Sequence, residues 1–541
     1  MKNILLNSFL LLLSFCFTYP IQAHIGSSGV VFEGNAGKYA LQVYVQPPDV
    51  IPGTAKVTVI ADANDIQKVN IKPIYYWFGD EGSPRSDEAF PVANQAGRYE
   101  GQIWLMNSGA ASVQVEIIGS RGKGSLIVPL VAIATAKRAM SPSLGWVLAG
   151  LGLLLVGLLT TIIGASTSDS LQTVGEPISG TTMKKRIKGS VIGASFCGVL
   201  LFVGNNWWNG LTDDYQRNLY KPYTANTKVI EENGVSVLKL QIDSNSVQRR
   251  WLSYAIPDHG KLMHLFLIRQ GTMDVFAHLH PSRKDTLNFE AQLPDLPAGK
   301  YLLYADVMRY QGAQYTIADT VEIKKQISNG NNSSTLKDPY DAYAITNPLN
   351  TKEASIKSDL ITICGTPGVK TKLQDGSSIV WEEDPNKPLM MGKVYDLKFS
   401  ILSPDGTKAK LEPYLGMMGH AAIVKDDGSV YIHLHPTGTV SSTSVSVMQK
   451  RLDETSKKPN ILPAIAFKDS VDKIMTKLSM MTEAERDNFL MPNMLHTNDK
   501  AEHHNTVNFP YVFPQAGKYR IWLQVKRNGK ILTGTFDAKV M

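Results

Sequence analysis

Cysteine is scarce in this 541-residue chain. It occurs only as Cys16, Cys197 and Cys364, and the first two lie in long apolar segments. One remaining thiol excludes an intramolecular disulfide framework and any CxxC metal or redox site. A bound metal would therefore need nitrogen and thioether ligands.

Strong charge and the familiar catalytic motifs are also missing. The net charge is only +7, and no basic patch interleaved with aromatic residues is present, so we expect no nucleic-acid partner. The sequence contains no GxSxG, no phosphate-binding glycine loop and no HExxH motif. Paired carboxylates suited to acid–base work are not evident either. We therefore predict that the protein is not an enzyme.

The first residues resemble a secretory signal. Lys2 is followed by an apolar core over residues 4–17, which at about fourteen residues is too short to span a bilayer. A cleavage site follows Ala23, so residues 1–23 are predicted to be a signal peptide.

Two later apolar segments predict a membrane hairpin. Residues 144–165 and 187–204 are the expected spans, joined by a loop over residues 166–186. A basic cluster (Lys184, Lys185, Arg186, Lys188) begins the second span, and Trp207 and Trp208 end it. The positive-inside rule places the loop in the cytoplasm and both flanks outside. This topology predicts a bacterial inner-membrane protein with its bulk in the periplasm. Small residues expected at the helix contact are Gly150, Gly152, Gly157, Gly189 and Gly193.

Three copies of one short sequence motif predict a repeated β fold. Residues 95–99, 297–301 and 515–519 each read as a turn with Ala-Gly-Lys/Arg-Tyr, followed by an alternating strand. This pattern is typical of β-sandwich domains. The predicted fold is mainly β, with three immunoglobulin-like β-sandwich domains outside the membrane plus the two-helix transmembrane hairpin. The expected boundaries are a first domain at 24–140, a second at 210–326, a linker at 327–350, and a third domain at 351–541 with a helical insertion at about 440–505.

Two His-x-His hairpins carry the clearest functional signal. His264 precedes His278-Leu279-His280-Pro281 by fourteen residues, and His420 precedes His433-Leu434-His435-Pro436 by thirteen. Both spacings fit two antiparallel strands joined by a tight turn. Six of the eleven histidines lie in these hairpins.

Strand alternation places both histidines of each pair on one face, where they can converge on one ion. The expected ligand sets are His264, His278 and His280 in one domain, and His420, His433 and His435 in the other. Met263 and Met418 are candidate thioether ligands. Imidazole suits copper, zinc and nickel, and thioether favours Cu(I), so copper is the expected metal and zinc the alternative.

Other interpretations of these histidines stay open. Each His-x-His-Pro could be a structural device in which the histidines bind neighbouring loops and the proline ends the strand. The hairpins could also form a partly exposed recognition surface for another protein. After cleavage, His24 would become an N-terminal histidine able to chelate copper with its amine, but residues 25–140 contain no second histidine.

The first domain resembles a known family. Its Gly37-Lys38-Tyr39, Pro47-Pro48, Pro52-Gly53 and Ala96-Gly97-Arg98-Tyr99 are similar to YtkA-like domains, exported β-sandwiches related to CopC-like copper carriers. The resemblance implies an immunoglobulin-like fold and an association with copper, but no activity. CopC-like carriers pair an N-terminal His with further ligands in one domain; only His24 matches, so that site is not carried over.

These observations predict a membrane-anchored periplasmic protein that binds copper for tolerance, storage or delivery. The competing prediction is an immunoglobulin-like interaction or assembly scaffold for another envelope protein, without a metal.

Overall fold

The computed structural model describes residues 24–25, 29–137, 140–168, 175–248, 250–324, 338–349, 361–362, 364–454, 458–490 and 505–541. The predicted signal peptide lies outside these ranges. The described chain is mainly β, with several sheets and two long apolar helices, as the sequence predicts. It divides into two compact units. One contains residues 133–220 with a short piece at 49–51, and the other contains the remaining residues.

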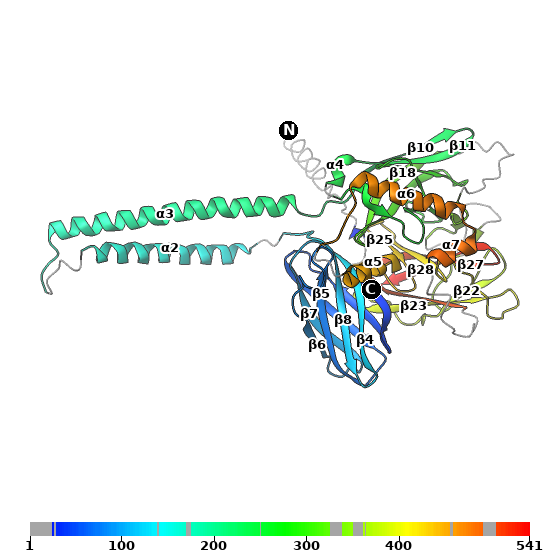
Figure 1. Ribbon diagram of the computed structural model, residues 1–541, viewed down its shortest axis with the longest axis horizontal. Helices are drawn as coiled ribbons and strands as arrows, with labels where there is room; N and C mark the ends of the chain where they lie inside the picture. Colours follow the sequence, from blue (N-terminus) through cyan, green and yellow to red (C-terminus); the bar gives the residue numbers. More distant parts are fainter. Residues whose placement is uncertain are drawn as a thin grey trace, which may run out of the picture. The chain divides into compact units, whose positions relative to one another are not determined.

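The smaller unit is a helical hairpin of α2 (Pro142–Ser166) and α3 (Gly180–Arg217) (Figure 1). Ser141 and Ser179 cap the two N-termini through their hydroxyl oxygens. Both helices are long and apolar enough to cross a membrane.

Only part of the predicted glycine contact is present in this hairpin. Gly189 lies against Thr167, and Gly193 lies against Ile163, so a side chain at either position would clash or crowd its neighbour. The predictions for Gly150, Gly152 and Gly157 are wrong: these residues are exposed. The close contact is confined to the loop end of the hairpin.

The N-terminal part of the larger unit is an eight-stranded antiparallel sheet in the order β2-β3-β4-β7-β6-β5-β8-β9. Its first and last strands contact each other, so the sheet closes on itself around an apolar core. Alternating burial along β3 (Tyr39–Gln46) shows one face turned inward. The other strands are β2 (Val30–Ala36), β4 (Gly53–Ala61), β5 (Ile66–Tyr75), β6 (Asp87–Pro91), β7 (Arg98–Leu105), β8 (Gly109–Gly119) and β9 (Gly122–Ala132).

Residues after 220 form two further pairs of sheets. The first pair is a four-stranded sheet, β10-β11-β16-β15, and a seven-stranded sheet, β12-β17-β13-β14-β19-β20 with β18 beside β17. Their strands are β10 (Ala225–Glu232), β11 (Val235–Ile242), β12 (Ala255–Ile256), β13 (His264–Arg269), β14 (Val275–Leu279), β15 (Ser282–Arg283), β16 (Asn288–Gln292), β17 (Gly299–Arg309), β18 (Gln314–Ile323), β19 (Ala342–Thr346) and β20 (Ile361–Thr362). The prediction of a linker over 327–350 is wrong in part, because β19 extends the sheet at the edge of β14.

The second pair repeats this plan with a four-stranded sheet, β21-β22-β23-β26, and a five-stranded sheet, β1-β25-β24-β27-β28. Its strands are β1 (His24–Ile25), β21 (Lys370–Lys372), β22 (Ser378–Trp381), β23 (Val394–Leu402), β24 (His420–Lys425), β25 (Val430–Leu434), β26 (Thr506–Val512), β27 (Gly517–Arg527) and β28 (Lys530–Val540). One apolar core, which includes Trp381, Phe399 and Phe536, fills the space between the two sheets.

The insertion predicted at about 440–505 contains three helices, α5 (Ser442–Asp453), α6 (Ala464–Met480) and α7 (Glu483–Leu490) (Figure 1). Arg451 of α5 donates to the Tyr76 carbonyl at 2.8 Å and so connects this insertion to the N-terminal sheet.

An aromatic core joins the seven-stranded sheet to the five-stranded sheet. Phe276 stacks on Trp522 with ring centroids 4.9 Å apart, and Tyr304 stacks on Tyr431 at 4.2 Å. Phe266 lies among these rings and is also fully buried. The remaining apolar residues of these strands lie on the opposite faces of the two sheets. The two domains therefore share one interface, which we call the inter-sheet core.

Replacing Trp522 with alanine should destabilise this interface by about 3–5 kcal/mol, because the side chain is fully buried and its loss leaves a cavity. Thermal unfolding of the purified full chain in detergent measures the change. Trp104→Ala is the matched control, because Trp104 is half exposed and its loss should cost clearly less than the loss of the fully buried Trp522. Equal losses in the two variants would contradict the role given to the inter-sheet core.

Candidate metal centre

Seven histidines gather at one end of the inter-sheet core, and none is more than 8% exposed. We call them the histidine cluster: His259, His264, His278, His280, His420, His433 and His435. The two hairpins are antiparallel, as predicted, through the pairs β13–β14 and β24–β25.

Strand alternation turns both hairpins toward each other. Phe266, on the same face of β13 as His264, lies in the inter-sheet core together with Phe276 of β14, on the same face as His278. Tyr431 of β25 does the same beside His433. Ile432 and Leu434, on the opposite face, pack into the third domain's own core. The histidines therefore continue the aromatic interface instead of lying on a surface. The interpretation of the hairpins as partly exposed contacts for another protein is wrong.

The structure brings together the first predicted ligand set. One nitrogen of each of His264, His278 and His280 lies within 4.8 Å of the other two. His264 Nδ1 and His278 Nε2 are 3.2 Å apart.

Hydrogen bonds to the other ring nitrogens assign the tautomers of this pair. His264 Nε2 lies 3.2 Å from the Asp258 carbonyl oxygen, which can only accept. His278 Nδ1 lies 2.8 Å from Gln524 Oε1 and 3.2 Å from the Tyr414 hydroxyl, which itself donates to the Tyr340 carbonyl. Both of those nitrogens therefore carry the proton, and a neutral His264 Nδ1 and a neutral His278 Nε2 face each other with lone pairs.

Burial keeps both rings neutral. It lowers the pKa of His264 to about 4 and that of His278 well below its ordinary value, with the neighbouring rings adding to the effect. At neutral pH no proton is available to bridge the two lone pairs. A metal cation between the two nitrogens would remove this repulsion.

His280 has the arrangement expected of a metal ligand with an outer carboxylate. Its Nδ1 donates to Asp341 Oδ1 at 2.8 Å, and its backbone N–H donates to the same oxygen at 2.8 Å. Ligating histidines usually donate their second N–H to a carboxylate or carbonyl in this way. Its Nε2 is buried and has no hydrogen-bond partner among the described residues.

Three buried carboxyl groups, none of them among the predicted ligands, lie at the cluster. They are Asp258, Asp306 and Asp341. Burial raises the pKa of Asp306 to about 7, and burial with the nearby Asp338 charge raises that of Asp341 to about 8. Burial acts to raise the pKa of Asp258 too, but the adjacent His259, His435 and His264 together lower it.

The second predicted set is corrected by the structure. His420 and His435 meet His259, with ligand nitrogens within 4.8 Å of one another, and among the described residues His433 belongs to no such group. His433 Nδ1 instead lies 3.7 Å from Asp306 Oδ2, because the facing sheet places that carboxylate opposite the ring.

Seven ring nitrogens of the cluster lack a hydrogen-bond partner within the described chain. They are His280 Nε2 and both nitrogens of His420, His433 and His435. An unsatisfied buried polar group costs roughly 1–3 kcal/mol. Seven would cost about as much as the entire net stability of a domain, roughly 5–15 kcal/mol. In each neutral ring one nitrogen carries a proton and the other a lone pair, so the cluster presents several unpaired lone pairs inside the protein.

Sequence reasoning missed His259 and Asp258, which lie in a tight turn before the first hairpin. Asp258 and Lys261 exchange backbone hydrogen bonds of 2.8 and 2.9 Å, and the two central residues, His259 (φ 48°) and Gly260 (φ 80°), are left-handed. The N-cap residue of α5, Ser441, donates its hydroxyl to the Asp258 carboxylate. The sequence does contain a pattern that could have revealed His259. A turn whose second central residue is glycine precedes both His264 and His420 at the same spacing, as His259-Gly260 and as Leu415-Gly416.

The remaining candidate ligands lie outside the cluster or stay predictions. Met418 packs against the apolar core of the third domain, so a role as ligand is not supported. Met263 is fully buried beside His264 in sequence, and its thioether role stays a prediction. The backbone of His24 pairs with Val430, at the opposite end of β25 from His433 and His435.

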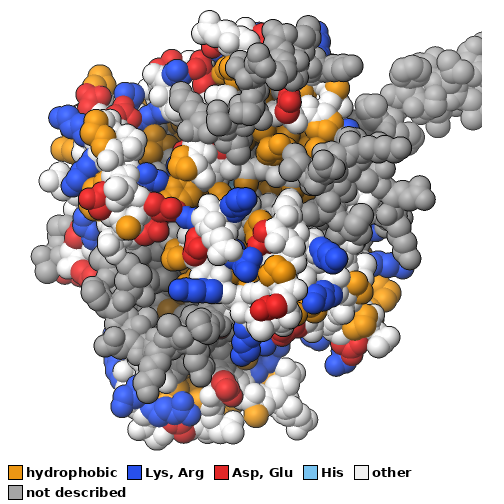
Figure 2. Space-filling model, turned by 90° about the vertical axis from the view of Figure 1, so that its right-hand side faces the viewer, with side chains coloured by type: hydrophobic (Ala, Val, Ile, Leu, Met, Phe, Trp, Pro, Cys, Tyr) orange, Lys and Arg blue, Asp and Glu red, His pale blue; other side chains and the backbone are white. Residues whose placement is uncertain are grey.

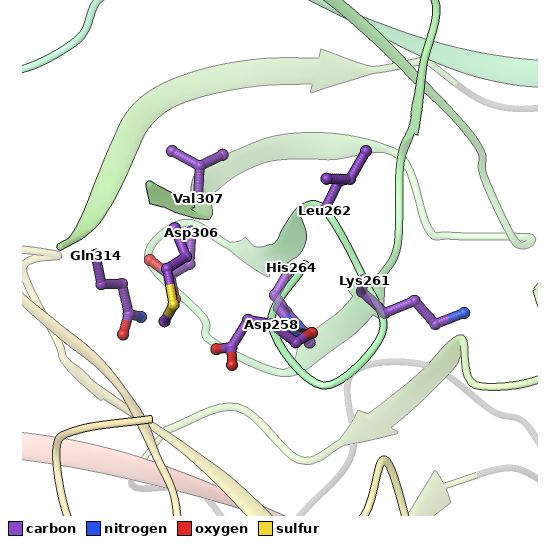
Figure 3. A pocket seen from close by; sticks show the side chains of 8 residues that line it. Asp258, Lys261, Leu262, His264, Asp306, Val307 and Gln314 are labelled. Atoms are coloured by element: carbon purple, nitrogen blue, oxygen red, sulfur yellow. Dashed lines mark hydrogen bonds between the residues drawn. The ribbon is translucent and has the colours of Figure 1, made fainter. Parts of the chain in front are cut away.

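A small pocket lies beside His264 (Figure 3). Asp258 and His264 lie next to each other in this pocket, and the Lys261 side chain extends away from them. Asp306 and Gln314 line the other side. The pocket has no room for a water molecule, which leaves no space for an organic substrate there.

The described part of the face in Figure 2 carries interspersed Lys/Arg and Asp/Glu side chains without a continuous basic patch.

Comparison with known protein families finds a match in the region that contains the histidine cluster, but the match gives no activity. A family described as a domain of unknown function (DUF8832) matches residues 223–325, 372–468 and 481–541. These segments contain all seven histidines of the cluster. The N-terminal sheet and the helical hairpin lie outside the match. No curated protein matches the chain.

Similar solved structures include latent PorU from Porphyromonas gingivalis, at 7% identity over 95% of this chain, with a TM-score of 0.13. The chain spans 34% of that protein. A putative membrane anchored protein from Corynebacterium diphtheriae matches at 10% identity over 95% of this chain and 96% of its own, also with a TM-score of 0.13. TM-scores this low carry no argument about fold or function.

The metal-free protein should lose stability as the pH falls from about 6.5 to about 5. All seven cluster histidines have a lowered pKa in the folded state, mainly through burial. The unfolded chain therefore binds more protons in this range, which favours unfolding. Asp306 and Asp341 act in the opposite direction, but they are two groups against seven.

Thermal unfolding of the chelator-treated full chain at pH 5 and pH 7 tests this balance. We expect a Tm about 5–10 °C lower at pH 5. An equal or higher Tm at pH 5 would show that the histidines are not buried in neutral form.

Proposed function

We propose that this protein is a membrane-anchored metal-binding protein whose histidine cluster holds copper for tolerance, storage or delivery, and that it is not an enzyme. The single observation that carries the proposal is the approach of His264 Nδ1 to His278 Nε2, 3.2 Å apart in a fully buried site, while the other nitrogen of each ring contacts a hydrogen-bond acceptor.

This spacing fits two ligands of one ion. Metal–imidazole nitrogen distances are about 2.0 Å, so nitrogens 3.2 Å apart subtend about 105° at the ion, near the tetrahedral angle. His280 Nε2 supplies a third nitrogen within 4.8 Å of the other two. The second N–H of each ligand is already bound, to the Asp258 carbonyl, Gln524 and Asp341 respectively, which fixes the ring orientations.

The donor set favours copper over the alternatives. Imidazole binds copper, zinc and nickel, and for a given nitrogen site Cu²⁺ has the highest affinity of the divalent first-row ions. Hard cations such as Mg²⁺ and Ca²⁺ prefer oxygen ligands and do not suit a set of imidazoles. Zinc is the competing ion.

The location proposed for the protein is the bacterial inner membrane, with the β domains in the periplasm. Two apolar helices of sufficient length, the basic cluster at Lys184–Lys188 and the tryptophans at the other end of α3 support this topology. The proposal includes three immunoglobulin-like β-sandwich domains of the YtkA-like or CopC-like type, supported by the paired sheets and the repeated turn motif.

Metal content of the purified full chain tests the function. The protein is stripped with a chelator, equilibrated separately with Cu(I), Cu(II) and Zn(II), and dialysed before metal analysis. We expect copper to be retained, and retention to be lost in His280→Ala plus His435→Ala, because this pair removes a ligand from each hairpin.

Histidines outside the described residues provide the matched control. His496→Ala plus His503→Ala removes the same number of imidazoles and should leave retention unchanged. Unchanged retention in the His280/His435 variant would remove the cluster as the binding site. If the wild-type protein retained no metal, the scaffold alternative would be favoured.

A further inference from the structure

Resting on the proposed metal centre, we infer that the cluster holds two ions and that the second is bound by His259, His420 and His435. This set differs from the one predicted for the third domain, because His259 comes from the second domain and takes the place of His433. The first ion remains with His264, His278 and His280. The centre is thus dinuclear and shared between two domains.

The second set has the properties of a built site. Its ligand nitrogens lie within 4.8 Å of one another, and all three residues are at least nine-tenths buried. His420 and His435 have no hydrogen bond on either ring nitrogen in the described chain. His259 Nε2 lies 3.3 Å from Asp258 Oδ1 and 3.4 Å from Ser441 Oγ, which hold its ring in place.

The strained backbone conformation of His259 supports a functional role for this residue. A non-glycine residue at φ 48° is disfavoured, and residues held in such conformations gather at functional sites. The corresponding turn before the other hairpin has Leu415 in the same conformation (φ 50°), and Leu415 packs against Tyr340 and Tyr414 in a small apolar cluster. The two copies of one turn have therefore diverged, and only one places an imidazole across the interface.

The two sets are close but separate. The nearest ring centroids between them are 6.4 Å apart for His259 and His264, and 6.5 Å apart for His278 and His420. His433 lies between the sets, with its ring centroid 5.2 Å from that of His264 and 5.4 Å from that of His420. Two cations at this separation repel each other, and the buried carboxylate of Asp258, which lies beside His259, supplies negative charge next to them.

The surroundings of the two sets are not equivalent. His278 of the first set faces the neutral Gln524, whose strand position opposite His420 corresponds to that of Asp306 opposite His264. His259 of the second set lies against the Asp258 carboxylate. We therefore expect the two ions to differ in affinity, so that loading proceeds in two steps.

The number of copper ions retained per full-length chain tests this inference. Wild-type protein should retain two. His259→Asn should retain one, since asparagine tolerates the left-handed turn but removes the imidazole. His278→Asn should also retain one, because its amide preserves the bond to Gln524 while deleting Nε2. The combined variant should retain none.

A second variant and a second measurement separate the loss of a metal ligand from misfolding of one variant. His420→Gln removes another ligand of the second set and should also retain one ion. Paramagnetic resonance of the Cu(II)-loaded protein should give less than one spin per copper in the wild type, through coupling of the two ions, and one spin per copper in each single variant. His496→Asn, outside the described residues, should behave as wild type.

Each outcome decides a different point. A wild-type maximum of one ion, abolished by either single variant, would overturn the dinuclear centre and leave the proposed function standing. Two ions retained in both His259→Asn and His420→Gln would remove the second set as their site. Failure of the wild type to retain any metal would instead overturn the proposed function.

Discussion

Burying seven imidazoles whose nitrogens find few hydrogen-bond partners is the constraint on which the arrangement of these domains depends. Bringing two His-x-His strands face to face requires the seven-stranded and five-stranded sheets to pack closely. The aromatic rings of the inter-sheet core stabilise that packing, with Phe276 on Trp522 and Tyr304 on Tyr431. The cluster at the end of the interface opposes it, since each unpaired buried nitrogen costs free energy. A cation bound as proposed would offset this cost, because a ligand that binds only the folded state favours folding.

Duplication followed by divergence explains how one cluster came to contain unlike parts. Both copies keep the turn, the hairpin and the His-x-His pair, and each sends a residue across to the other copy. Tyr414 and Gln524 of the third domain contact His278 of the second, while Asp306 of the second domain contacts Tyr431 and faces His433 of the third. Where one copy has Asp258-His259 the other has Tyr414-Leu415. Through these reciprocal contacts each domain supplies hydrogen-bond or charged partners to the histidines of the other.

Local patterns in the sequence were sufficient for the elements and for six of the seven histidines. Alternation along each strand predicts which side of β14 and β25 carries the histidines, and the hydrophobic length of α2 and α3 predicts two spans. The prediction failed where tertiary contacts decide. His259 belongs to a turn, and only sheet packing brings it to His420 and His435. Asp306 and Asp341 are distant in sequence from the residues they face, and the edge strand β19 forms within a segment whose composition is typical of a linker.

X-ray absorption at the copper edge of the loaded full chain tests the central claim most directly. Binding within the histidine cluster predicts a first shell of nitrogen at about 2.0 Å with the outer-shell scattering of imidazole rings. It also predicts no thiolate shell at about 2.3 Å, since Cys364 is distant in sequence from both hairpins and bonded to its own surroundings. A first shell of oxygen without imidazole scattering would contradict the account, because it would place the metal outside the cluster.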